Sequence, residues 1–109
     1  MDITTQVNQV SVVTVTGRVD ASTAPRLEQQ LRNLIDGGNP KIVLDLERVD
    51  YLASAGLHVL ISMFKAARRA NGELRLCAVP PQVQEVLDIS GQSALFAGYP
   101  NAGQAVSSF

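Results

Sequence analysis

The hydroxyl of Ser54 and the imidazole of His58, four residues later in YLASAGLHVL (residues 51–60), are the side chains whose types and spacing could support nucleophilic chemistry. A serine nucleophile needs a histidine base and an acid that orients it, and in one large class it lies on a G-x-S-x-G turn. His58 is the only histidine, no Ser-His-Asp order has a suitable spacing, and ASAGL lacks the first glycine of that turn. We therefore expect no serine-hydrolase chemistry.

Other catalytic and cofactor-binding motifs are absent from the sequence. None of G-x-x-x-x-G-K-[ST], G-x-G-x-x-G, C-x-x-C or H-E-x-x-H occurs, so the sequence offers no phosphate-binding loop, dinucleotide turn or zinc-binding histidine pair. The single cysteine, Cys77 in ELRLCAV, cannot form an internal disulfide, and we interpret it as a small buried strand side chain. The sequence predicts a protein that is not an enzyme and uses no metal or cofactor.

Hydrophobic periodicity in the first half of the chain indicates strands and one helix. The valine-rich start, up to Gly17, predicts two short strands joined by a turn near residues 8–9. Apolar residues at helical spacing in DASTAPRLEQQLRNLIDGG (residues 20–38) predict an amphipathic helix with Ser22 or Thr23 as its N-cap. The chain therefore opens with two strands followed by a helix.

The second half of the chain continues this alternation. KIVLDL (residues 41–46) is a compact apolar run, typical of a central strand covered on both faces. The elements expected after it are a helix from about Leu57 to Asn71, a strand in ELRLCAV, a helix in QVQEVLDIS, a weak strand near ALFAG (residues 94–98) and a short helix in NAGQAVSSF. The order β-β-α-β-α-β-α with a β-α tail predicts a small α/β layer structure with a partly parallel sheet.

The helix that follows Ser54 has two distinct faces. His58 falls on a polar face, which we interpret as solvated. The apolar stripe on the other side is widened by Val59 and Met63 beyond the arc that one sheet face needs. This surplus predicts an exposed protein-binding patch beside Ser54, which a modification could switch. Two alternatives stay open: Ser54 caps the helix, and Val59 and Met63 are covered by another part of the fold.

Length, composition and charge are those of one globular domain. The chain has 109 residues, of which 46% are hydrophobic and 17% charged, and its net charge is −1. No broad cationic surface is available for nucleic acid or anionic lipid. The start, MDITTQVNQV, lacks the pattern of a signal peptide, and no apolar run has the length of a membrane span. We expect a cytoplasmic domain over residues 1–109, with neither nucleic acid nor membrane as a partner.

The stretch IVLDLERVDYLASAGLHVL (residues 42–60), with the segment that follows it to Gly91, resembles the core of the STAS domain. The resemblance is to the branch of bacterial anti-sigma factor antagonists, in which a strand ending in Asp-Leu precedes an aromatic, an aliphatic and a Ser-Gly-Leu motif that opens a helix. GRVDASTA (residues 17–24) is similar to the family's Gly-x-x-Asp segment. The resemblance implies about four to five strands in a mixed sheet, with helices packed mainly on one face.

The function implied by this resemblance is partner switching. The unphosphorylated form of such a protein binds an anti-sigma factor that is a GHKL-type serine kinase, and so releases the sigma factor. The kinase phosphorylates the serine matching Ser54, which breaks the complex, and a PP2C-type phosphatase restores it. We expect Gly56 to permit close backbone approach, and we expect the partner-binding surface to comprise Asp20, Ser22, Ala53, Ser54, Ala55, Gly56, His58, Val59 and Met63.

The residue before the serine departs from the family pattern. The frequent acid at that position is replaced by Ala53, and Ala55 follows the serine. Loss of the carboxylate removes one possible contact to a kinase or its magnesium. An alternative function is therefore a constitutive STAS interaction or scaffold module without a phosphate switch, and a third is a small-molecule binder at the loop around Ser54. For Asp20, an Asx-type turn or helix cap is an alternative to partner binding.

Overall fold

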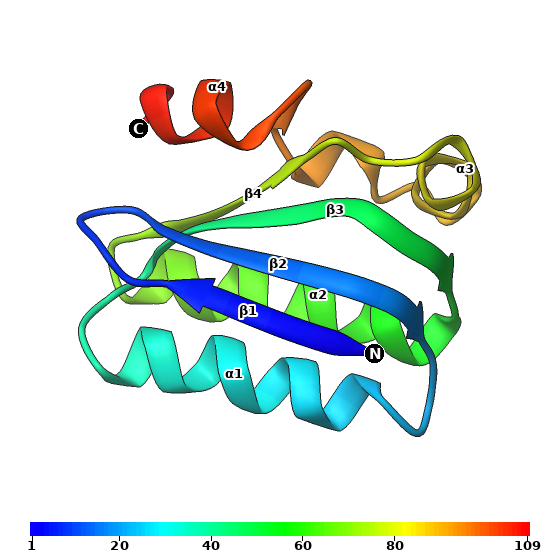
Figure 1. Ribbon diagram of the computed structural model, residues 1–109, viewed down its shortest axis with the longest axis horizontal. Helices are drawn as coiled ribbons and strands as arrows, with labels where there is room; N and C mark the ends of the chain where they lie inside the picture. The colour runs from blue at the N-terminus through cyan, green and yellow to red at the C-terminus, as the bar shows by residue number, and fades with distance from the viewer.

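The computed structural model describes residues 1–109 and contains a five-stranded mixed sheet with helices on both faces (Figure 1). The strand order is β1-β2-β3-β4-β5, in which β1 is antiparallel to β2 and all other neighbouring strands are parallel. The element order confirms the predicted α/β fold class. The strands are β1 (Asp2–Gln6), β2 (Ser11–Val19), β3 (Lys41–Leu52), β4 (Glu73–Cys77) and β5 (Gly98–Tyr99), and the helices are α1 (Ala24–Asp36), α2 (Ser54–Arg69), α3 (Pro81–Ile89) and α4 (Ala102–Ser107).

The main hydrophobic core lies between the sheet and the helices α1 and α2, which run side by side beneath one face (Figure 1). Alternate residues of β2, Val13 and Val15, point into this core and are fully buried. Leu31 of α1 and Leu60 of α2 are fully buried with them, and α3 packs into the same core through Val83 and its neighbours. The expectation of helices mainly on one face is confirmed.

The opposite face of the sheet has a smaller cover. Here α4 packs over β3, β4 and β5, and Val43, Cys77 and Ala105 form a second buried cluster (Figure 1). Val10, in the turn before β2, and Val12 of β2 lie beside this cluster but are only half-buried. The apolar surface on this face is therefore wider than the helix that covers it.

The central strand is longer than predicted, and the prediction that it ends at residue 46 is wrong. β3 continues through the charged Glu47-Arg48 pair to Leu52. The register between β2 and β3 shifts twice along this stretch, which breaks the period-two alternation. As a result Val49 and Leu52 are both buried although they lie three residues apart. A sequence pattern that assumes strict alternation cannot detect such a strand.

The position of the last strand also differs from the prediction. Ser93–Leu95 form a short 3-10 helix, and β5 consists of Gly98 and Tyr99, later than expected. Phe96 turns inward and meets the ring of Phe64 edge to face, with 5.3 Å between ring centroids. Phe96 therefore fills the core between elements, whereas Ala94 and Ala97 are exposed and only Gly98 of ALFAG belongs to the strand.

Candidate functional site

The loops that follow β2 and β3 meet at one edge of the sheet. These strands are parallel neighbours, so their carboxyl ends lie together, and Val19 pairs with Leu52 in the last position of the ladder. The backbone N–H of Ala53 donates to the carbonyl oxygen of Val19 at 2.9 Å. This bond extends the sheet by one residue and places Ser54 beside the loop that begins at Asp20.

Ser54 is the first residue of α2, and its side chain is exposed. The N-cap is Ala53, which has an extended backbone (φ −84°, ψ 171°) and no capping side chain. The interpretation of Ser54 as the helix cap is therefore wrong, because the helix begins one residue earlier than that role requires. No side chain accepts a hydrogen bond from the first N–H groups of α2, and no acidic residue lies in its first turn.

Gly56 lies where α2 approaches the ends of β2 and β3 most closely. A Cβ atom at this position would lie 2.6 Å from Leu52 Cδ1, 2.7 Å from Val19 Cγ1 and 3.1 Å from the carbonyl oxygen of Val19. The close backbone approach expected at Gly56 is therefore observed. The residue is buried, so its part in the surface is to let α2 and Ser54 sit against the sheet.

The prediction of an exposed apolar face on α2 is wrong. Val59 is 5% exposed and Met63 is 0% exposed, because α1 packs along α2 and covers the part of the apolar arc that the sheet does not. Their alternative interpretation, that they are covered by another part of the fold, is the one the structure supports. Met63 cannot contact a partner of the folded protein, and Val59 can contribute only the few atoms that reach the surface.

Asp20 organises the loop between β2 and α1. Its Oδ1 accepts hydrogen bonds from the Ser22 hydroxyl (2.7 Å), the Ser22 N–H (3.0 Å) and the Thr23 N–H (3.2 Å). Thr23 Oγ1 in turn accepts from the Asp20 N–H (2.9 Å) and donates to the carbonyl oxygen of Arg18 (2.9 Å). The bond from the Ser22 hydroxyl is the main cause that holds the pKa of Asp20 below its ordinary value of 3.8. Asp20 therefore forms the Asx-type turn, and α1 begins with Thr23 at its N-cap position.

Two residues at this edge were not predicted as part of the site. The guanidinium of Arg18 lies over the ring of Tyr51, 4.5 Å from its centroid, and Arg18 Nε is 3.7 Å from Asp20 Oδ2. Tyr51 is 44% exposed. Arg18 and Tyr51 pair across β2 and β3. The sequence does place each of them within three residues of a predicted site residue, Arg18 near Asp20 and Tyr51 near Ala53.

A shallow groove of about 320 Å³ runs between the amino-terminal turns of α1 and α2. Ala55, His58 and Val59 line it from α2, and Glu28 lines it from α1. The rest of its wall is apolar and comes from the start of α1 and the loop before it, through Ala21, Ala24 and Pro25. His58 is exposed at the rim, as expected of a solvated side chain. The groove adjoins Ser54 through Ala55, the next residue of α2.

The structure brings together most, but not all, of the predicted surface. Ser54 and His58 are exposed on α2, Ala53 and Ala55 are half-buried, and Ser22 is exposed on the adjoining loop. No group of three or more His, Cys, Asp or Glu side chains is placed to hold a metal ion. None of the helices has both the length and the apolar character needed to cross a membrane.

Comparison with known proteins agrees with this geometry. A family model for the STAS domain matches residues 3–105. A proposed anti-sigma factor antagonist of Bordetella bronchiseptica, BtrV, is 38% identical over 91 residues, which cover 84% of this chain and 78% of the relative. The anti-sigma F factor antagonist of Paenibacillus polymyxa is 30% identical over 98 residues, covering 89% of this chain and 84% of the relative.

A comparison with solved structures agrees with the sequence matches. The crystal structure of an anti-sigma factor antagonist from Mycobacterium paratuberculosis has 31% sequence identity and a TM-score of 0.84, and the match covers 98% of this chain and 93% of that one. Sequence and fold therefore agree over nearly the whole chain, and the protein belongs to the STAS domain family.

Proposed function

We propose that this protein is an anti-sigma factor antagonist, a binding regulator and not an enzyme, whose partner docks on the surface around Ser54. The observation that carries the proposal is the position of Ser54: an exposed hydroxyl at the first residue of α2, beside the groove between α1 and α2. The related chains from Bordetella and Paenibacillus are named as antagonists of this class. The partner is an anti-sigma factor of the GHKL-type serine kinase class, and its binding releases the sigma factor.

Phosphorylation of Ser54 is the switch in this proposal. A phosphate adds about −1.5 to −2 charges at neutral pH. The free N–H groups and the dipole of α2 favour an anion at this end of the helix, and no acidic side chain in the first turn opposes it. The fold therefore tolerates the modification, and a PP2C-type phosphatase reverses it.

The same charge disrupts the complex. The groove wall beside Ser54 is mostly apolar, so a docked partner would have to desolvate the phosphate dianion against it. A penalty of about 3 kcal/mol lowers the affinity by about two orders of magnitude. A change confined to one side chain is sufficient, and no rearrangement of the sheet is needed.

The test is phosphorylation by the cognate kinase followed by intact-mass measurement. The unsubstituted chain should gain one phosphate, Ser54→Ala should gain none, and Ser62→Ala, a control on the same helix, should gain one. In a binding assay, Ser54→Asp should weaken the complex with the kinase by at least about tenfold. Retention of the added mass in Ser54→Ala would show that the switch lies elsewhere.

The second candidate function is a constitutive interaction module, and Ala53 is the observation that favours it. The position of Ala53 is set by its backbone bond to Val19, and its methyl group offers no contact to a kinase-bound magnesium ion. In this case Ser54→Asp binds its partner as tightly as the unsubstituted chain, and no phosphate is added.

A further inference from the structure

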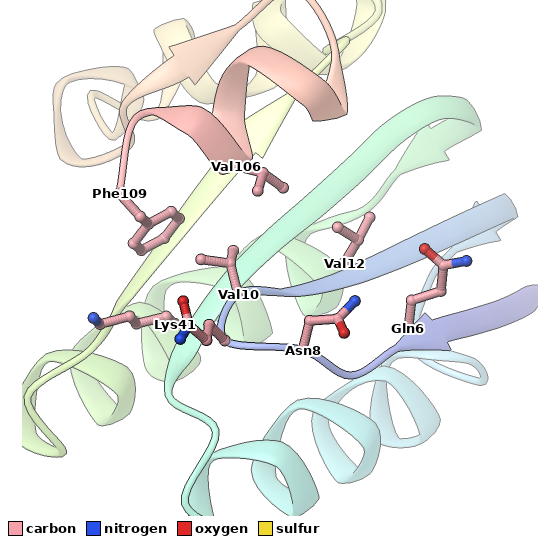
Figure 2. A pocket seen from close by; sticks show the side chains of 8 residues that line it. Gln6, Asn8, Val10, Val12, Lys41, Val106 and Phe109 are labelled. Atoms are coloured by element: carbon pink, nitrogen blue, oxygen red, sulfur yellow. The ribbon is translucent and has the colours of Figure 1, made fainter.

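The largest groove of the protein lies far from Ser54 in the fold. It has a volume of about 550 Å³, within the range of small-molecule sites, and opens on the face of the sheet that carries α4 (Figure 2). It lies beside the first residues of β2 and β3, whereas Ser54 lies two residues after the last residue of β3. Figure 2 shows Val10 and Val12 below and Val106 of α4 above, facing one another across it.

The apolar part of this groove continues the second hydrophobic cluster. Val10, Val12 and Val106 pack against that cluster but remain half-buried, because α4 does not extend over β2. Phe109, which is 37% exposed, adds an aromatic wall. A hydrocarbon chain placed here would remove these side chains from water, which is favourable by about 25 cal/mol per Å² of apolar area.

The polar rim carries one uncompensated cation. Lys41, at the start of β3, lies at the rim on the same side as Phe109 (Figure 2), is exposed and takes part in no ion pair. The remaining polar rim residues are amides, including Gln6 and Asn8. Lys41 is the only charged side chain among the residues that line the groove.

The aromatic wall is held in place by a neighbouring arginine. The guanidinium of Arg75 lies over the Phe109 ring, 4.0 Å from its centroid, and donates to Ser108 Oγ at 2.6 Å. Arg75 is itself paired with Glu73 at 2.8 Å and is not among the residues that line the groove. The groove is therefore formed before any ligand arrives, and Lys41 is the cation that is free to bind an anion.

We propose that this groove binds a small carboxylic acid with a short apolar chain, with the carboxylate on Lys41 and the chain between β2 and α4. The anion requirement follows from the unpaired ammonium and the absence of acids on the wall. The requirement for a chain follows from the valines and Phe109. This site is independent of the proposed switch at Ser54, since it lies on the other face and at the other end of β3.

The test uses hexanoate as probe, followed by amide NMR shifts of the full chain at constant pH and ionic strength. Hexanoate should give saturable shifts at Val10, Val12 and Val106. Hexanamide, which keeps the chain but lacks the charge, and acetate, which keeps the charge but lacks the chain, should each bind at least about fivefold more weakly.

Substitution of the two lysines separates the site from general charge effects. Lys41→Gln should weaken hexanoate binding by about fivefold, as expected for a partly exposed ion pair. Lys65→Gln, the matched control on α2, should leave the dissociation constant unchanged. Absence of saturable shifts with hexanoate, equal binding of hexanamide, or an equal effect of the two lysine substitutions would each overturn the proposal. The comparison of hexanoate with hexanamide uses the unsubstituted chain. It therefore shows whether binding requires the carboxylate charge even if Lys41→Gln does not fold.

Discussion

The two faces of the sheet differ in how firmly their cover is held. On one face α1 and α2, of 13 and 16 residues, pack on the strands and bury large side chains completely. On the other face α4 has 6 residues, and its carboxyl end is joined to the sheet through Arg75. A long, fully packed helix gives Ser54 a fixed position, whereas a short one leaves apolar surface free for a ligand.

The largest expected effect concerns the firmly packed face. Gly56→Val should lower the free energy of unfolding by about 3 kcal/mol, because its added atoms collide with Val19 and Leu52, which are buried and cannot move aside. Urea unfolding followed by circular dichroism measures the change. Gly103→Val on α4 is the control, since a Cβ there has only the side chain of Asn101 at 3.4 Å, and should cost less than about 1 kcal/mol. Equal losses of unfolding free energy in the two variants would show that the covers of the two faces do not differ in how firmly they are packed.

A smaller effect is expected when the cover of the second face is loosened. Cys77 is fully buried beneath this cover, and burial raises the pKa of its thiol to about 12, so alkylation requires local opening. Arg75→Met removes the contacts to Ser108 and Phe109 and should speed alkylation by iodoacetamide about tenfold, measured by intact mass. Arg69→Met, on the last turn of α2, should react at the unsubstituted rate. If α4 opens no faster without Arg75, its carboxyl end is held by packing alone.

The smallest effect concerns the loop beside Ser54. The folded-state pKa of Asp20 is lowered, so its contribution to stability is present above the ordinary value of 3.8 and is lost as the pH falls through the folded value. Ser22→Ala removes the main cause and should move the Asp20 pKa upward, measured by NMR of its carboxyl carbon. Ser90→Ala, at the end of α3, should leave that titration unchanged. An unchanged pKa in Ser22→Ala would assign the shift to the backbone donors instead.

Much of the fold could be predicted from local pattern. Apolar residues at helical spacing located α1, α2 and α3, and the β-branched opening located the hairpin, because these signals depend on a single element. The periodicity placed the start of α2 at about Leu57, three residues later than its first residue, Ser54. The resemblance to the STAS pattern supplied both the serine that opens this helix and the close approach at Gly56. The family resemblance added the placement of most helices on one face.

The errors arose where one element determines the environment of another. Val59 and Met63 looked like surplus apolar surface because the sequence does not show that α1 covers them. The extension of β3 to Leu52 depends on register shifts against β2, which no pattern in β3 alone reveals. The contact between Arg18 and Tyr51 likewise exists only because two strands end side by side.

The hydrogen bond between the Ala53 N–H and the Val19 carbonyl has an evolutionary consequence. It fixes the approach to Ser54 through a backbone group that every residue except proline possesses. The side chain at this position is therefore free to vary without displacing the serine. Residue 53 can therefore carry an alanine in place of an acid while the backbone that positions Ser54 stays the same.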